Sequence, residues 1–158
     1  MERGVRLGVD VGSVRIGVAA SDPDGIMAFP VETVATGEGD AARVAAIASD
    51  RGAVTIFVGL PRTLKGAHGA SADFAQAFAR KVAELTTADV RLIDERFSTA
   101  SASRALTGAG KSAKAQRQII DQAAAVVILE TALEVDRQGN LGTVTEWIPR
   151  EGHDDRPV

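Results

Sequence analysis

The order of hydrophobic patterns along the chain constrains its fold more than any other feature of the sequence. The first third holds short apolar runs of strand length separated by turn residues, and helical patterns then alternate with further short apolar runs. Three strands are predicted in the first third, at Val5–Val9, Ile16–Ala20 and Ile26–Val34. Short connections between them favour an antiparallel meander, and Pro30 favours an edge position for the third strand.

The later patterns predict an alternation of helices and parallel strands. The expected elements are a helix over 40–51, a strand at Val54–Val58, a helix over 71–85, a strand at Val90–Ile93, a short helix between Ser98 and Gly108, and a long helix ending near Arg137. Together these elements predict an α/β fold whose mixed five-stranded sheet carries helices on its faces. We expect one domain over residues 1–138 and a C-terminal extension over 139–158 that is disordered at its end.

Two of the predicted helices have an apolar side that should face the sheet. In the helix over 71–85 the spacing predicts a core stripe of Phe74, Phe78, Val82 and Leu85. In the long helix the expected buried side includes Ile119, Ile120, Ala123 and Val127. No regular element is predicted after Gly139.

The composition excludes several kinds of chemistry. The 158 residues include no cysteine and only two histidines, so thiolate nucleophiles, disulfides and cysteine or histidine metal sites are excluded. A metal ion in this protein would therefore have oxygen ligands. No apolar run approaches the roughly 18 residues that span a bilayer, and no signal region precedes the first strand. We expect a cytoplasmic protein with no membrane partner.

Carboxylates at three places are candidates for catalysis. Asp10 ends the first strand, and Asp94 and Glu95 follow a later one, where only one of the two can share a face with Asp10. Asp121 lies in the most apolar helix, where an anion is costly unless a cation or hydrogen bonds compensate it. Each has a structural alternative: a turn cap for Asp10, a solvated strand end for the acidic pair, and an ion pair with Arg117 for Asp121.

Acidic side chains from two strand ends and one packed helix would form an oxygen site suited to Mg²⁺ or Mn²⁺. Two such ions can activate a water molecule and stabilise the leaving oxygen during phosphodiester cleavage. The constellation of Asp10, Glu95 and Asp121 therefore favours a metal-dependent nuclease, with two ions expected.

A basic segment lies between the second and third of these carboxylates. Residues 96–120 carry five positive charges and no negative charge, whereas the whole chain has a net charge of −3. Within this segment Lys111, Lys114 and Arg117 are candidates for contacts with a nucleic-acid backbone, although a solvated helical face is the simpler alternative. Phosphate contacts carry no sequence information, so the segment does not distinguish RNA from DNA.

Four motifs stand in order along the chain: DVGSVRIGVAASD at 10–22, VGLPRTLKGAHG at 58–69, IDERFST at 93–99 and IDQAAAVVIL at 120–129. Together they resemble the YqgF family, also called RuvX, whose members are described as Holliday-junction resolvases and pre-16S ribosomal RNA nucleases. The resemblance extends from about Gly4 to Leu133 and implies an RNase H-like fold.

The resemblance implies roles for particular residues. Asp10, Glu95 and Asp121 match the catalytic, metal-binding carboxylates of the family, and Arg15, Arg96 and Thr99 match positions near phosphate or substrate. The chain has Ser98-Thr99 where many members have two threonines, which keeps both hydroxyl groups. Established junction resolvases of this fold carry another acidic residue three positions after the helix aspartate, where this chain has Ala124.

Three functions follow as expectations. The first is a nuclease that matures the 5′ end of 16S ribosomal RNA precursor, acting on structured RNA as a monomer or homodimer. The second is a Holliday junction resolvase, which requires a symmetric dimer because a DNA junction has two-fold symmetry. The third is a non-catalytic module that binds nucleic acid during ribosome assembly. An actin-like ATPase is disfavoured because it needs two such domains and this chain supplies one.

Overall fold

The computed structural model describes residues 3–61, 70–94 and 113–149, and within them the side chains of 3–61, 72–94, 122–142 and 145–149. The short helix predicted between Ser98 and Gly108 and the end of the C-terminal extension lie outside the described residues. No helix in the described part of the chain combines the length and hydropathy needed to cross a bilayer.

A single mixed sheet organises the described residues. Its strands are β1 (Val5–Val11), β2 (Arg15–Ser21), β3 (Ala28–Ala35), β4 (Ala53–Leu60), β5 (Asp89–Asp94) and β6 (Thr145–Trp147), in the spatial order β3-β2-β1-β4-β5-β6. The first three are antiparallel neighbours, β1, β4 and β5 are parallel, and β6 is antiparallel to β5. The predicted meander and the two parallel strands are therefore confirmed.

The sixth strand was not predicted, and it comes from the segment assigned to the C-terminal extension. A single turn, α5 (Leu141–Val144), leads into β6, and the Ile148 amide just beyond it donates a hydrogen bond to the Val90 carbonyl at 2.9 Å. Ile148 is buried in the core. Three residues are too few to show an alternating pattern, so β6 depends on pairing with β5 rather than on local sequence.

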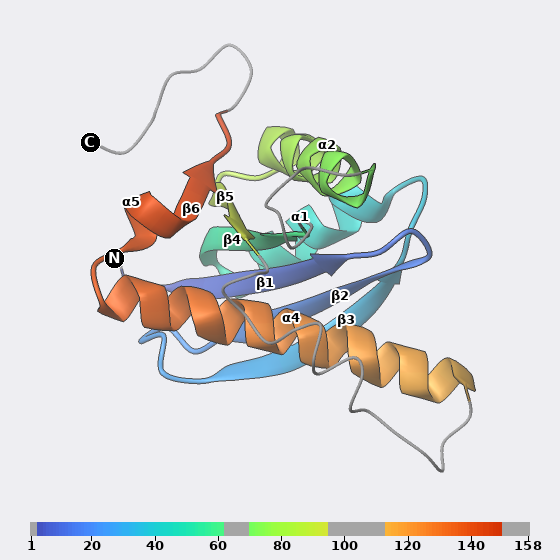
Figure 1. Cartoon of the computed structure of the whole chain (residues 1–158), viewed down its shortest axis with the longest axis horizontal. Coiled ribbons are helices and arrows are strands. Elements are labelled where there is room, and N and C mark those ends of the chain that lie inside the picture. The colour runs from blue at the N-terminus through green and yellow to red at the C-terminus, as the bar shows by residue number, and fades with distance from the viewer. Residues whose placement is uncertain (1–2, 62–69, 95–112, 150–158) are drawn as a thin grey trace.

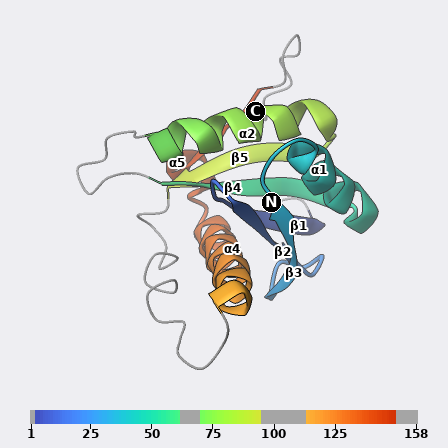
Figure 2. The same ribbon diagram turned by 90° about the vertical axis from the view of Figure 1, so that its right-hand side faces the viewer.

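Helices cover both faces of the sheet (Figures 1 and 2). Two of them, α1 (Asp40–Arg51) and α2 (Ala70–Leu85), pack on one face, and α4 (Ala113–Arg137) crosses β1, β2 and β3 on the other. Figure 2 shows the sheet between α4 on one side and the α1–α2 pair on the other. The predicted helices over 40–51 and 71–85 and the long helix ending at Arg137 are confirmed.

Strand alternation divides the core into two parts. Leu7 and Val9 of β1 belong to the larger part, beneath α1 and α2, whereas Phe57 of β4 and Ile93 of β5 belong to the smaller part, beneath α4. Because successive strand side chains point to opposite faces, Gly8 lies on the α4 side of β1. Below, the α4 face means this side of the sheet.

The core stripe predicted for α2 is partly wrong. Phe78 and Val82 are buried as expected, but Phe74 is 43% exposed and Leu85 is 56% exposed. The buried side of the helix is completed by alanines: Ala72, Ala75, Ala79 and Ala83. Small side chains allow α2 to pack closely on the sheet, and this choice of face leaves two large apolar side chains in solvent.

The buried side of α4 also differs from the prediction. It consists of Ala124, Ala125, Ile128, Leu129, Ala132 and Leu133, while Ala123 and Val127 are half-buried. The side chains of Ile119 and Ile120 lie outside the described set. Apolar residues are spread around the helix without one pronounced apolar side, so periodicity alone did not fix which side faces the sheet.

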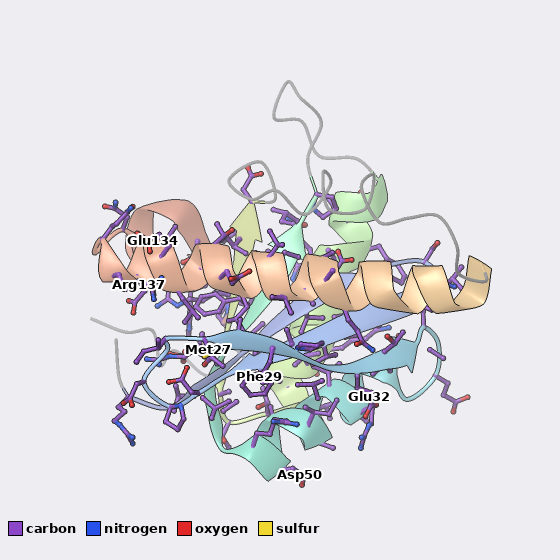
Figure 3. The ribbon with its side chains drawn as sticks, turned by 90° about the horizontal axis from the view of Figure 1, so that it is seen from below. Met27, Phe29, Glu32, Asp50, Glu134 and Arg137 are labelled. Atoms are coloured by element: carbon purple, nitrogen blue, oxygen red, sulfur yellow. The ribbon has the colours of Figure 1, made fainter. Side chains whose placement is uncertain are left out.

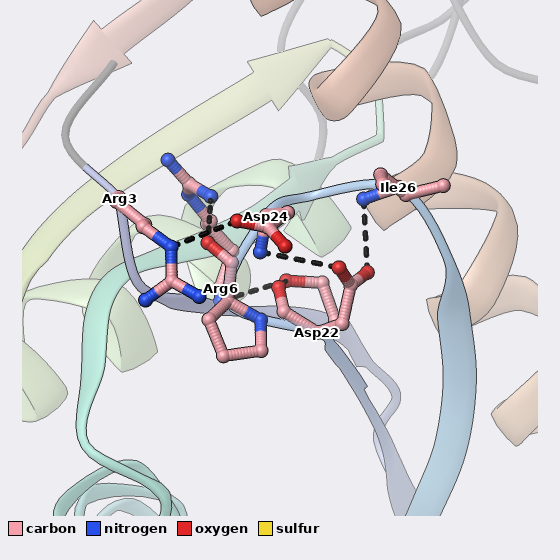
Figure 4. Close-up of polar contacts among 7 residues, drawn as sticks. Arg3, Arg6, Asp22, Asp24 and Ile26 are labelled. Atoms are coloured by element: carbon pink, nitrogen blue, oxygen red, sulfur yellow. Dashed lines mark hydrogen bonds and ion pairs between the residues drawn. The ribbon is translucent and has the colours of Figure 1, made fainter.

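The β2–β3 turn lies at the end of the sheet where β1 begins (Figure 4). The Asp22 carboxylate accepts hydrogen bonds from the amides of Met27 at 2.7 Å, Ile26 at 2.9 Å and Asp24 at 3.1 Å. These bonds, that from Met27 foremost, lower the pKa of Asp22 because they favour the ionised carboxylate. Arg3 pairs with Asp24 at 2.8 Å and joins the N-terminal segment to the same turn.

Strand β3 forms an edge of the sheet, with Phe29 and Glu32 on it and Met27 just before it (Figure 3). Arg43 of α1 donates two hydrogen bonds to the Glu32 carboxylate, at 2.6 and 2.8 Å. This contact lowers the pKa of Glu32 and raises that of Arg43. The pair is largely exposed, so it orients α1 against β3 more than it stabilises the fold.

Helix α4 lies very close to β1 at Gly8. A Cβ atom at this position would lie 2.7 Å from the Ala125 carbonyl oxygen and 2.7 Å from the Leu129 Cβ. Real Cβ atoms do not come that close to other heavy atoms, so the absence of a side chain at Gly8 sets how near α4 lies to β1.

We expect Gly8→Ala to lower the free energy of unfolding by about 1–3 kcal/mol, the usual range for overpacking a core. Chemical denaturation would measure the change. Gly142→Ala is the matched control, because a Cβ there meets nothing within 4 Å. Equal stability of the two variants would show that α4 can move away from β1 without cost.

Candidate active site

Asp10 is a buried carboxylate on the α4 face of the sheet. It is 4% exposed and follows Val9, whose side chain points into the opposite core beneath α1 and α2. Alternation along β1 therefore directs Asp10 and Gly8 to the same side, towards α4. A carboxylate buried to this extent must be compensated by hydrogen bonds or positive charge, as a catalytic or metal-binding group commonly is.

The strands on either side of Asp10 present glycines next to it. Gly17 of β2 is its direct register partner, and Gly59 of β4 follows Val58, which pairs with Val9. Neither neighbouring strand therefore places a side chain beside Asp10 on the α4 face.

A hydrogen bond locates α4 over the same row of the sheet. The Gln122 side-chain amide donates to the Thr33 hydroxyl at 2.9 Å. Thr33 of β3 pairs with Gly17, which pairs with Asp10. The turn of α4 that contains Gln122 therefore lies at the level of Asp10 along the strands.

The contact at Gly8 gives the same result independently. Arg137 donates to the Gly25 carbonyl near the beginning of β1, and Ala125 lies over Gly8 further along, so α4 runs antiparallel to β1. One helical turn from Ala125 back to Asp121 spans about 6 Å, and two strand residues from Gly8 to Asp10 span about 6.6 Å. The backbone of Asp121 therefore lies at the level of Asp10, while its side chain is outside the described set.

Asp94 lies on the other face of the sheet. Leu92 belongs to the core beneath α1 and α2, and Ile93 belongs to the core beneath α4. Because strand side chains alternate between faces, Asp94 points to the α1–α2 side, as Leu92 does. It is 7% exposed. The described geometry thus separates Asp94 from Asp10, and Glu95 lies outside the described residues.

The predicted nucleic-acid-binding residues are only partly described. Arg15 begins β2 on the α4 face, two residues before Gly17, and is half-buried. Lys114 and Arg117 lie in the first turns of α4, ahead of Asp121, but their side chains are not described. Arg96, Thr99 and Lys111 lie outside the described residues. The alternative ion pair between Arg117 and Asp121 lies outside the described side chains.

Ala124 stands three residues after Asp121, at the position compared above with the additional acidic residue of junction resolvases. It is fully buried and packs with Ala19, Phe57 and Ile93 between α4 and the sheet. A carboxylate in this apolar contact would be desolvated without a described partner. The local packing therefore suits alanine.

The loop after Asp10 is held by a residue that the sequence did not indicate. Gly12 donates from its amide to the Arg15 carbonyl at 2.9 Å, closing the β1–β2 connection. Thr36, just past β3, donates from its hydroxyl to the Gly12 carbonyl at 2.8 Å and from its amide to the Val14 carbonyl at 3.0 Å. A single polar residue after a strand carries no signal of such a long-range contact.

The donor set near Asp10 fits a hard divalent cation. The residues with described side chains contain no cluster of three His, Cys, Asp or Glu that could hold a metal. Asp10 supplies a carboxylate that is flanked on the sheet by glycines, and oxygen donors are what Mg²⁺ and Mn²⁺ prefer. The other two predicted ligands, Glu95 and Asp121, have side chains outside the described set.

The fold is RNase H-like and resembles that of RuvC. RuvC of T. thermophilus, solved in complex with a Holliday junction substrate, matches 92% of this chain and 99% of its own, with a TM-score of 0.57 and 15% identity. A second Thermus thermophilus RuvC structure matches with a TM-score of 0.57 and 17% identity, covering 91% of this chain and 99% of that one. These likenesses concern the fold.

The chain belongs to the RuvX family, whose model, described as "Holliday junction resolvase", matches residues 4–135. Relatives named "Putative pre-16S rRNA nuclease" are similar over most of their length. The protein of Leifsonia xyli subsp. xyli is 54% identical, covering 87% of this chain and 90% of its own. That of Thermobifida fusca is 46% identical, covering 94% and 100%. The family resemblance inferred from the four motifs is thereby confirmed.

We expect Thr36→Val to loosen the loop after Asp10, because valine keeps the shape but removes the hydroxyl donor to Gly12. The predicted cost in unfolding free energy is about 0.5–1.5 kcal/mol, the net worth of one hydrogen bond. Amide exchange at Gly12 should accelerate in this variant and remain near the parent rate in Thr36→Ser, which retains the donor. Equal protection of Gly12 in Thr36→Val and the parent would mean that Thr36 does not hold the loop.

Proposed function

We propose that this protein is a metal-dependent nuclease that hydrolyses phosphodiester bonds in structured RNA and matures the 5′ end of 16S ribosomal RNA precursor. The observation that carries the proposal is the row of residues across the sheet that contains Thr33, Gly17 and Asp10. Buried Asp10 stands between glycines, beneath the turn of α4 that contains Asp121. RuvX membership and the names of the relatives support nuclease chemistry on this RNA.

Asp10 and Asp121 hold the metal in this proposal, and Glu95 either completes the ligand set or orients the attacking water. Mg²⁺ or Mn²⁺, as two ions when bound, would neutralise the phosphate charge and lower the pKa of a bound water. The chain itself keeps Asp10 in place through β1 and its glycine neighbours. It also limits bulk water around the carboxylate, since Asp10 is buried between sheet and helix.

Basic residues position the RNA strand. Arg15 lies on the same face as Asp10, so its guanidinium is suited to a phosphate next to the one that is cleaved. Arg96, Thr99, Lys111, Lys114 and Arg117 extend this contact in the proposal. Their charges add affinity without sequence preference, so RNA shape selects the cleavage position.

A DNA junction resolvase is the second candidate, because the family model carries that description. This function needs a two-fold symmetric dimer with two active sites. Mass in solution and cleavage of a synthetic four-way junction, measured beside cleavage of precursor RNA, distinguish the candidates. A monomer that cuts RNA but leaves the junction intact supports the first proposal, and a dimer with the reverse preference supports the second.

Mapping of ribosomal RNA ends in cells tests the proposed function directly. Depleting the protein should lead to accumulation of precursor extended at the 5′ end, and the parent gene should restore the mature end. Asp10→Asn should fail to restore it, although the protein is present and folded. Full restoration by Asp10→Asn would instead support a non-catalytic module that assists ribosome assembly.

The face assignment of the acidic pair generates a prediction for cleavage. Asp94 points away from Asp10, so Asp94→Asn should retain most activity, while Glu95→Gln should remove nearly all of it. A Mn²⁺-dependent cleavage assay on precursor RNA measures both variants, with thermal melts to verify folding. The reverse order of losses would assign the catalytic role to Asp94.

Asp121→Asn distinguishes a metal ligand from a structural ion pair. If Asp121 binds metal, carboxylates repel one another without it, so the metal-free variant should be as stable as the parent or more so. It should also lose cleavage and much of the stabilisation by millimolar Mn²⁺. If Asp121 instead pairs with Arg117, the metal-free variant should lose roughly 3–5 kcal/mol. Melts with Mn²⁺ and with a chelator measure both effects.

A further inference from the structure

A groove of about 510 Å³ lies between the N-terminal end of α1 and the length of α2. These helices cover the face of the sheet opposite α4, so the groove is separated from the Asp10 carboxylate by the sheet (Figure 2). The residues of α2 that line the groove are therefore not part of the proposed nuclease site.

The groove has an apolar floor and apolar walls. Phe78 and Ala41 are buried beneath it, and the walls include Phe74, 43% exposed, and Leu85, 56% exposed. These are the two large apolar side chains of α2 that remain exposed when α2 packs on the sheet. Apolar groups exposed around a concave surface are typical of a site that binds a side chain of another molecule.

Negative charge predominates at the rim. Glu38 and Asp40 stand at the α1 end, Glu84 on α2, and Lys81 is the one basic residue among those that line the groove. Asp40 is engaged locally, because its carboxylate accepts hydrogen bonds from the amides of Gly37 and Ala41. Within the described part of the chain, Glu38 and Glu84 form no ion pair, so their charges face solvent.

This combination selects one class of occupant. Nucleic acid is disfavoured because phosphates would meet like charge at Glu38 and Glu84, and no exposed aromatic pair offers base stacking. An acidic peptide is disfavoured for the same electrostatic reason, and Asp40 already occupies the positive end of α1. A basic peptide with a bulky apolar residue matches both the rim and the floor.

We propose that the groove between α1 and α2 is a docking site for a basic protein segment whose apolar side chains lie over Phe78, between Phe74 at one end of the groove and Leu85 at the other. Its lysine or arginine residues pair with Glu38 and Glu84. The site does not depend on the nuclease activity, because it lies on the other face of the sheet and uses none of the catalytic residues.

Fluorescence anisotropy with a labelled lysine-rich peptide containing a central Leu-Phe pair tests the proposal on the full chain. The parent protein should bind this peptide. Its affinity for the same peptide with Ser-Ser in place of Leu-Phe should be at least about tenfold lower. Leu85→Ser and the double variant Glu38→Lys/Glu84→Lys should each weaken binding by about tenfold. All three positions are exposed, so the fold should be kept, which thermal melts verify.

Matched variants outside the groove provide the control. Ile26→Ser removes an apolar side chain that is 72% exposed at the β2–β3 turn, and Glu130→Lys/Glu146→Lys reverses two exposed acids on other elements. These variants should bind the peptide like the parent. The proposal is overturned if the parent fails to bind the Leu-Phe peptide, or if groove and control variants weaken binding equally. The second result would indicate general attraction to an acidic protein.

Discussion

The contact between α4 and β1 at Gly8 is the constraint on which the α4 side of the molecule depends. Only a residue without a side chain lets the Ala125 carbonyl and Leu129 come within van der Waals reach of the strand backbone. The hydrogen bond from Gln122 to Thr33 then fixes the helix along its axis. Two anchor points on a rigid helix leave little freedom for the turn next to them, which contains Asp121.

Glycine serves a second purpose two residues further along the same face. Burying the Asp10 carboxylate carries an effective penalty of several kcal/mol unless it is compensated. Gly17 and Gly59 place no side chain beside Asp10 on the α4 face, so a bound cation could contribute to that compensation without displacing a neighbouring side chain. The glycines beside Asp10 therefore suit its proposed role as a metal ligand.

The two faces of the sheet are covered by different helices and carry different candidate sites. On one side α4 lies on β1, β2 and β3 and covers Asp10. On the other, alanines bring α2 against the sheet and against α1, and the larger Phe74 and Leu85 are left beside a groove with an acidic rim. One layer of strands thus supports a candidate reaction site and a candidate docking site that can be occupied at the same time.

The sequence by itself determined the order of the first five strands and of α1, α2 and α4, the family, and the position of Asp10 at a strand end, because these follow from local periodicity and contiguous motifs. Tertiary structure alone decided that Asp94 faces away from Asp10, that Thr36 holds the loop after it, and that β6 joins the sheet. It also decided which side of α2 is buried. Each of these depends on contacts between residues far apart in the chain, where strand register and helix rotation are set by packing rather than by neighbouring residues.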